Sequence, residues 1–216
     1  MAKKVLVIVG SESGTAKRGI KLMMQKWPGA GKDFVLADTK DGNTIGADLA
    51  SLKEYDVVLI STSSYGEGDP PDNYVTFFEA LQKAAASGEK PLEGLQHAVL
   101  GWGSSVYDTF QNCPRLSDKY LGECGSRRIA QRAELDESAD DEQVDQPMYK
   151  KFSDEVSAAL KSLPAADAAP ACDWTSPASK ILVHSGSAAG AGVGVGAILA
   201  VVVAAGAGYY YYTTQM

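Results

Sequence analysis

The first residues that could do chemistry form a short hydroxyl-rich turn, SESGTA, at residues 11–16. The turn follows an apolar run and precedes a helical pattern, so its backbone N–H groups are predicted to lie at a helix N-terminus. A turn of this kind can bind a phosphate group without a fixed cation, and Gly14 lets the backbone approach closely. The pattern GxxxxGK[ST] of nucleoside triphosphatases is missing from this turn. A simple helix cap is the alternative interpretation of the same residues.

Two further loops each place one tyrosine among glycines and hydroxyl residues. SSYGEGDPPDN (residues 63–73) follows the apolar run YDVVLI, and GWGSSVYDTF (residues 101–110) overlaps the end of AVLGW. If both runs are parallel strands, Tyr65 and Tyr107 lie on neighbouring loops at one edge of the sheet. Two such rings can stack on both faces of a flat aromatic group. Each tyrosine alone also suits a partly buried loop residue, but one ligand with a phosphate and an aromatic ring would account for all three loops.

The apolar runs that precede these loops predict a parallel sheet. Continuous short apolar runs are typical of strands buried on both faces, whereas a more polar run suits an edge. The four apolar runs are VLVIV (residues 5–9), FVLA (34–37), VVLI (57–60) and AVLGW (98–102), and the polar run is RRIAQRA (127–133).

Helical patterns alternate with these runs. Helices are predicted at residues 16–27, 72–86, 116–121 and 148–163, with a shorter one at 46–52 and with Asp72 as an N-cap. Alternation of this kind predicts an α/β three-layer sandwich with a five-stranded parallel sheet in the flavodoxin-like order 2-1-3-4-5. The alternative is a six-stranded dinucleotide-binding fold, which the absence of GxGxxG after the first strand disfavours.

Composition limits the class of partner. The 216 residues carry a formal net charge of -7, and an acidic protein is a poor match for nucleic acid. A basic protein partner suits the charge better. The three cysteines, Cys113, Cys124 and Cys172, fit neither a disulfide framework nor a metal site, and they indicate reduced thiols in the cytosol.

The C-terminal part of the chain predicts a membrane anchor. We expect a domain over residues 1–163, an Ala/Pro-rich linker over 164–184 and a transmembrane tail anchor over 185–212, with the domain facing the cytosol. No charged residue follows Lys180, and four tyrosines close the span. The endoplasmic reticulum and the mitochondrial outer membrane are both open as locations. A disordered Gly/Ala tail is the alternative, and Cys172 is either an acylation site or a plain thiol.

The three loops, in this order and spacing, resemble the FMN domain of the diflavin reductases, the cytochrome P450 reductase family, over roughly residues 3–163. The resemblance implies that the first loop binds the FMN phosphate, that Tyr65 and Tyr107 cover the two faces of the flavin, and that backbone near both tyrosines bonds the ring edge. Asp136 and Glu137 correspond more weakly to acidic residues near the flavin. The implied cofactor-binding residues are Ser11, Glu12, Ser13, Gly14, Thr15, Ala16, Ser63, Ser64, Tyr65, Gly66, Trp102, Gly103, Ser104, Ser105, Tyr107, Phe110, Asp136 and Glu137.

This resemblance predicts an electron carrier that needs no catalytic acid, base or nucleophile. The carrier would pass single electrons from an FAD/NADPH reductase to a haem or iron–sulfur protein. Docking is predicted on an acidic rim formed by Glu67, Asp69, Asp72 and the seven carboxylates of residues 134–145. The FAD/NADPH half of a diflavin reductase is not expected in this chain. The alternatives are an FMN-dependent NAD(P)H:quinone reductase and an adaptor that has lost its flavin.

Overall fold

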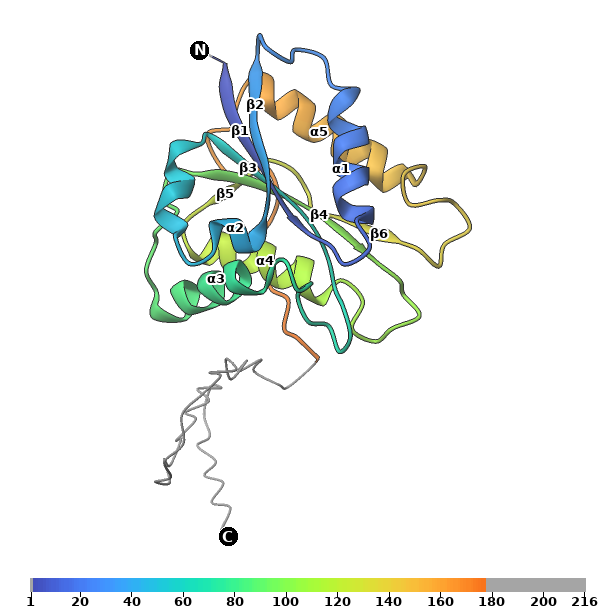
Figure 1. Cartoon of the computed structure of the whole chain (residues 1–216). Helices are drawn as coiled ribbons and strands as arrows, with labels where there is room; N and C mark the ends of the chain where they lie inside the picture. The colour runs from blue at the N-terminus through green and yellow to red at the C-terminus, as the bar shows by residue number, and fades with distance from the viewer. Residues whose placement is uncertain (1, 178–216) are drawn as a thin grey trace, which may run out of the picture. The chain divides into compact units, whose positions relative to one another are not determined.

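The computed structural model describes residues 2–177. They form one parallel sheet with helices on both faces (Figure 1). The elements, in chain order, are β1 (Lys3–Gly10), α1 (Thr15–Gln25), β2 (Phe34–Asp41), α2 (Gly42–Ile45), the 3₁₀ helix η1 (Leu49–Glu54), β3 (Val57–Ser63), α3 (Val75–Ser87), β4 (Gln96–Gly103), α4 (Asn112–Glu123), β5 (Arg127–Arg128), β6 (Ala133–Asp136) and α5 (Pro147–Lys161).

The predicted strand order 2-1-3-4-5 is confirmed. The sheet runs β2-β1-β3-β4-β5, and β6 also pairs with β4. The prediction of one continuous fifth strand over residues 127–133 was wrong in detail. Arg127–Arg128 pairs with the start of β4, the chain then leaves the ladder, and Ala133–Asp136 pairs with the end of β4. The return of the chain as β6 carries Asp136 to the same sheet edge as the end of β4.

The two faces of the sheet build two cores. Val5, Val7 and Val9 of β1 pack with α1 and α5, whereas Leu6 and Ile8 pack with α3 and α4. Every residue of this central strand from Val5 to Val9 is therefore buried, which explains its unbroken apolar run. The run FVLA behaves differently because β2 is an edge strand. Val35 and Leu36 are 47% and 43% exposed, which corrects the expectation that both faces of this strand are covered.

The predicted helices form, with different limits. Asp72 is not an N-cap, because α3 begins at Val75 and Tyr74 occupies the cap position with its side chain fully buried. The helix predicted at residues 46–52 is replaced by α2 and η1 on either side of Gly46. Helix α4 begins at Asn112, four residues before the predicted start, and this start lies next to the loop that carries Tyr107.

A charged cluster lies inside the domain at the β5 end of the sheet. Asp118 of α4 accepts hydrogen bonds from Arg128 (Nε–Oδ1 2.9 Å) and Arg132 (Nη1–Oδ2 2.6 Å), and its Oδ1 lies 3.1 Å from Nε2 of His97. Arg132 also bonds Glu134. Asp118, Arg128 and His97 are each less than 5% exposed, so the cluster lies in a low-dielectric environment where each charge depends on its partners.

Protonation of His97 is expected to destabilise the fold as pH falls. Burial, aided by Arg128, lowers the pKa of His97 against the opposing effect of Asp118. The pKa of this histidine is about 6.5 in the unfolded chain and lower in the folded protein. Near and below pH 6.5 the unfolded state therefore binds more protons than the folded state, and the free energy of unfolding decreases as the pH is lowered. Urea unfolding between about pH 7.5 and 5.5 measures this loss, which reaches at most about 1.4 kcal/mol per pH unit for one group.

The control for this pH dependence uses the second histidine, His184, which lies outside the described residues. His184→Asn is expected to keep the pH dependence, and His97→Gln is expected to remove it. An unchanged pH slope in His97→Gln would assign the proton uptake to another group.

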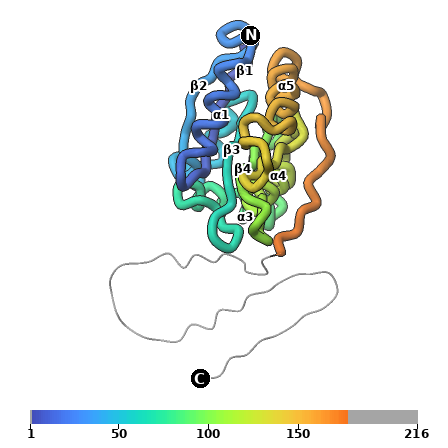
Figure 2. The backbone as a smooth tube through the Cα atoms, turned by 90° about the vertical axis from the view of Figure 1, so that its right-hand side faces the viewer, coloured from blue at the N-terminus to red at the C-terminus, as the bar shows by residue number. Residues whose placement is uncertain are grey.

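The segment after α5 stays in contact with the domain. Residues 164–177, here named the strap, contain no helix or strand but run along the β5 end of the sheet and past α4 (Figure 2). Asp167 accepts the backbone N–H of Arg128 (2.7 Å), and the N–H of Ala168 donates to the Arg128 carbonyl (2.9 Å). The first part of the sequence-predicted linker is thus packed against the domain.

No helix within residues 2–177 combines the length and apolar composition needed to cross a membrane. The transmembrane span predicted at residues 185–212 lies outside the described residues.

Candidate functional site

Three loops meet at one edge of the sheet, where β1, β3 and β4 end. They are residues 11–14 after β1, residues 64–74 after β3 and residues 104–111 after β4. The edge is closed by the residues that follow β6, because the N–H of Glu137 donates to the carbonyl of Gly103 (2.7 Å). In open parallel sheets, ligands bind outside the carboxyl ends of the strands at the point where strand order reverses, which here lies between β1 and β3.

The first loop offers backbone donors at the start of α1. Gly14 adopts a left-handed conformation (φ 80°), and its N–H donates to the hydroxyl of Ser11 (3.0 Å). Among residues 2–177, the N–H groups of Ser13, Thr15 and Ala16 donate to no protein acceptor. The hydroxyls of Ser13 and Thr15 lie beside them, 3.0 Å apart. These groups suit a phosphate, since each oxygen of that anion seeks such donors.

The first loop is also tied to the second. Asn73 accepts the N–H of Ser11 (2.9 Å), and Glu12 accepts the N–H of Asp72 (2.5 Å). Glu12 therefore supports the neighbouring loop with its carboxylate. Both contacts fix the distance between the donors at α1 and the loop that carries Tyr65.

The Tyr65 loop is a tight turn closed by its own backbone. Tyr65 and Asp69 exchange two N–H···O bonds of 2.8 and 2.7 Å, and the N–H of Gly68 also donates to Tyr65. Gly66 and Gly68 have φ angles of 51° and 96°, in the region that favours glycine. A Cβ at Gly68 would lie 2.9 Å from Thr109 Cβ, so this turn packs directly on the third loop.

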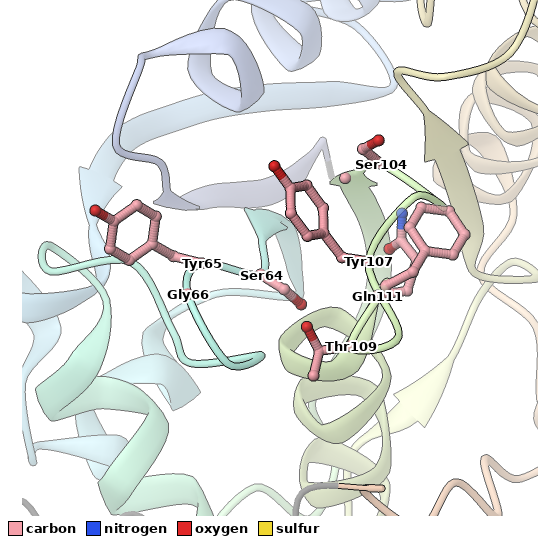
Figure 3. Close-up of a pocket in the computed structure, with 9 residues that line it drawn as sticks. Ser64, Tyr65, Gly66, Ser104, Tyr107, Thr109 and Gln111 are labelled. Carbon is pink, nitrogen blue, oxygen red and sulfur yellow. The ribbon is translucent and has the colours of Figure 1, made fainter.

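Between the two tyrosines lies a pocket of about 330 Å³. Tyr65 and Tyr107 are 59% and 65% exposed, and Figure 3 shows their rings rising from the two loops on either side of Ser64. The lining is completed by backbone and hydroxyl groups with one further aromatic ring: Ser64, Gly66, Gly103, Ser104, Thr109, Phe110 and Gln111. Large exposed aromatic rings flanking a pocket with few charges favour a flat aromatic ligand.

Trp102, which the sequence analysis places among the cofactor residues, has its side chain in the core. It is 2% exposed, packs against Tyr149 and leaves no room for a Cβ at Gly19 of α1. Its indole N–H donates to Ser61 (2.9 Å), and the Ser61 hydroxyl donates to the Ala16 carbonyl (2.9 Å). The side chain of Trp102 therefore supports the first turn of α1 from within the core and does not line the pocket between the tyrosines.

Asp136 and Glu137 lie beside the third loop. Asp136 accepts the N–H of Ser105 (2.9 Å) and bonds of 3.0 and 2.7 Å from the N–H and hydroxyl of Ser138. Partial burial raises the pKa of this carboxyl, but the hydrogen bonds from Ser105 and Ser138 outweigh that effect and hold it well below its usual range. Asp136 is thus a fixed negative charge at this edge, whereas Glu137 is exposed.

Several residues that build the pocket were missed by sequence reasoning. Gln111 is fully buried with a positive φ (61°), its amide donates to the Leu135 carbonyl (3.1 Å), and it fits because Gly101 has no side chain. Asn112 donates to the Gly68 carbonyl (3.0 Å), and Cys113 donates its backbone N–H to the hydroxyl of Ser64 (2.9 Å), a residue that the sequence analysis does name. In the sequence, these residues could have been recognised from the polar pair Gln111-Asn112, which directly follows Phe110 where α4 begins.

The fold and the site define a flavodoxin-like protein: a parallel sheet in the order 2-1-3-4-5, a phosphate-type loop after β1 and an aromatic pocket after β3 and β4. The chain belongs to the flavodoxin family, whose sequence profile matches residues 7–148. The cofactor of this family is FMN, and the protein is an FMN-binding electron-transfer domain related to the diflavin reductases.

The relatives support the same assignment. Human NADPH–cytochrome P450 reductase is 33% identical over 129 residues, which are 59% of this chain and 18% of the reductase. The Aspergillus terreus reductase is 28% identical over 165 residues, or 70% of this chain and 24% of that protein. The chain thus spans about a fifth to a quarter of these relatives.

Solved flavodoxins share the fold. The structure from Streptococcus pneumoniae superposes with a TM-score of 0.56 at 24% identity, covering 72% of this chain and 98% of that one. Oxidised flavodoxin 1 from Bacillus cereus gives a TM-score of 0.52 at 21% identity, covering 70% and 95%.

Proposed function

We propose that this protein is a membrane-anchored FMN electron carrier that passes single electrons between a flavin reductase and a haem or iron–sulfur protein. The observation that carries the proposal is the pairing of unbonded N–H donors at the start of α1 with the two-tyrosine pocket on the adjoining loops. One ligand with a phosphate at one end and a flat ring at the other satisfies both.

The N–H groups of Ser13, Thr15 and Ala16 and the hydroxyls of Ser13 and Thr15 would donate to the phosphate. Tyr65 and Tyr107 would hold the two faces of the ring, and backbone groups of residues 63–66 and 103–105 would bond its edge. When bound, FMN supplies one- and two-electron redox chemistry. The protein orients the ring, limits its contact with water and, through the fixed charge of Asp136, disfavours added negative charge on it.

The docking face in this proposal is the acidic rim beside the pocket. Glu134 does not belong to this rim, although it was predicted there, because its carboxylate forms salt bridges with Arg115 (2.6 Å) and Arg132 (2.8 Å). Glu67 and Asp72 remain exposed, as do the carboxylates of residues 137–145: Glu137, Asp140, Asp141, Glu142 and Asp145. Within residues 2–177 none of these seven lies in a salt bridge. A basic face on the reductase or on the acceptor complements such a rim and speeds encounter.

The membrane part of the proposal rests on sequence. The uncharged span at residues 185–212 is long enough for a bilayer, with the domain on the cytosolic side of the endoplasmic reticulum or mitochondrial outer membrane. The purified full chain should float with lipid vesicles in a density gradient, and a chain lacking residues 185–212 should stay at the bottom. Equal behaviour of the two chains would contradict the anchor.

Electron transfer is tested with the full chain in detergent, loaded with FMN and chemically reduced. Mixed with a basic c-type cytochrome in a stopped-flow instrument, it should reduce the haem at a rate that falls with salt. NADPH and a quinone, without an added reductase, should give no turnover. Failure to take up FMN, or direct turnover with NADPH, would overturn the carrier proposal.

Neutralising the rim is expected to slow this reaction. The triple variant Glu137→Gln, Asp140→Asn and Asp141→Asn should lower the second-order rate at low salt by about tenfold, because steering by a charged face changes association by about that much or more.

The matched control removes three exposed carboxylates elsewhere: Asp38→Asn, Glu54→Gln and Glu89→Gln. It changes net charge equally and should alter the rate by less than about twofold, because these carboxylates lie outside the predicted rim and salt screens interactions between exposed charges. Equal slowing by both triple variants would indicate net charge rather than a docking face.

A further inference from the structure

The strap is linked through one buried side chain to the turn at residues 65–69, which carries Tyr65 beside the pocket. The indole N–H of Trp174 donates to Oδ1 of Asn112 (3.0 Å), and the amide N–H of the same Asn112 donates to the carbonyl of Gly68 (3.0 Å). Asn112 is only 4% exposed. Residues more than a hundred positions apart, in the strap and in the Tyr65 turn, are therefore joined by two consecutive hydrogen bonds.

Trp174 is itself held in place. Its ring lies under the guanidinium of Arg115, with Cζ 4.1 Å from the ring centroid, and its carbonyl accepts a bond from Lys119 (3.1 Å). Arg115 is fixed in turn by its two bonds to Glu134. The indole is thus oriented on α4 by contacts separate from the bond to Asn112, which gives that bond a defined direction.

The bond to Asn112 decides how its amide points. A side-chain amide can turn its oxygen or its nitrogen toward a given neighbour. The indole N–H is only a donor, so it selects the oxygen of Asn112 and leaves the nitrogen for Gly68. Gly68 is buried, and a Cβ at this position would lie only 3.1 Å from the Cβ of Asn112. The backbone of the turn therefore packs closely against Asn112, which allows no large shift of the turn.

We propose that Trp174 is a positioning residue for the flavin pocket: through Asn112 it holds the turn at residues 65–69, and with it Tyr65 and Gly66, in the FMN-binding arrangement. This inference rests on the proposed function, because the pocket it adjusts is the one assigned to FMN. It gives the strap a role in cofactor affinity in addition to its packing against the domain.

The test is Trp174→Phe in the full chain, which keeps a ring under Arg115 and removes the N–H donor. The dissociation constant for FMN should rise about three- to tenfold, the range expected for loss of one hydrogen bond that supports the site. In the FMN-free protein, hydrogen exchange at the Gly68 and Asp69 amides should become about three- to tenfold faster, because both report opening of the turn.

The matched control is Trp27→Phe. Trp27 also donates an indole hydrogen bond, to Ser153 (2.8 Å), but in the core on the opposite face of the sheet. Both variants should lose some thermal stability, and only Trp174→Phe should change FMN affinity and exchange at the turn. Equal FMN affinities and equal exchange rates in the two variants would overturn the positioning role.

A double-mutant cycle separates the relay from general loosening. Asn112→Ala removes both bonds, so adding Trp174→Phe to it should leave FMN affinity unchanged within about twofold. Fully additive effects would contradict the relay. If the unaltered protein takes up no FMN, the proposed function fails, whereas the exchange measurement still decides whether Trp174 holds the turn.

Discussion

Replacing Asp118 with Asn is expected to lower the free energy of unfolding by about 3–5 kcal/mol, the usual cost of removing one partner from a buried ion cluster. Asparagine keeps the shape of the side chain but leaves Arg128 and Arg132 facing a neutral group in the core. Burial opposes the charged form of Asp118, but the bond from His97 and the two arginines keep its pKa below the usual range. Urea unfolding followed by tryptophan fluorescence measures the loss.

The isosteric control is Asp41→Asn. Asp41 pairs with Lys17 (3.3 Å) at the surface, where both side chains are about half exposed, and loss of such a pair costs less than about 1 kcal/mol. A small loss in Asp118→Asn, comparable to that of the control, would show that the arginines find other partners and that the cluster contributes little to stability.

Tyr107→Ala and Tyr65→Ala are each expected to weaken FMN binding by about ten- to a hundredfold. Loss of one aromatic partner from a stacked ring costs about 1–3 kcal/mol, and about 1.4 kcal/mol corresponds to tenfold in affinity. The fold should be unaffected, because both rings are more than half exposed and contribute little to the core. Quenching of FMN fluorescence on titration with protein gives the dissociation constants.

Tyr107→Phe is the matched control for stacking, since it keeps the ring and removes only the hydroxyl. It should bind FMN within about threefold of the unaltered protein. If the alanine variants bind as tightly as the phenylalanine variant, neither ring contacts the flavin and the assignment of the pocket is wrong.

Much of this architecture was predictable because its signals are local. The strand β1 is buried on both faces, so its apolar run is unbroken, and the loops that follow β1, β3 and β4 show their glycines, hydroxyls and tyrosines directly in the sequence. The alternation of strands and helices predicted a doubly wound sheet, and five strands fit the order 2-1-3-4-5. These features depend on residues within a few positions of one another.

The remainder depends on contacts between distant residues. The split of β5 and β6 reflects Arg128 and Arg132 turning inward to Asp118, a partner ten and fourteen positions away whose burial no local pattern reveals. The strap looks like a linker in composition, and its attachment needs Arg128, Asn112 and Arg115 to lie where the fold puts them.

Because of the strap, the two edge strands of the sheet differ in how readily they can pair with a second chain. At the β5 border, Asp167 and Ala168 occupy the N–H and C=O of Arg128, so little of that short strand is free to pair with another chain. Along the β2 border the structure describes such a contact at Phe34, whose carbonyl accepts the N–H of Gly31 (2.8 Å), and the exposed Val35 and Leu36 that follow lie between Asp33 and Asp38. An open strand border can recruit a second chain edge to edge. A fragment cut at Leu163 would therefore lack the cover at the β5 border, and it should self-associate more readily than one that ends at residue 177.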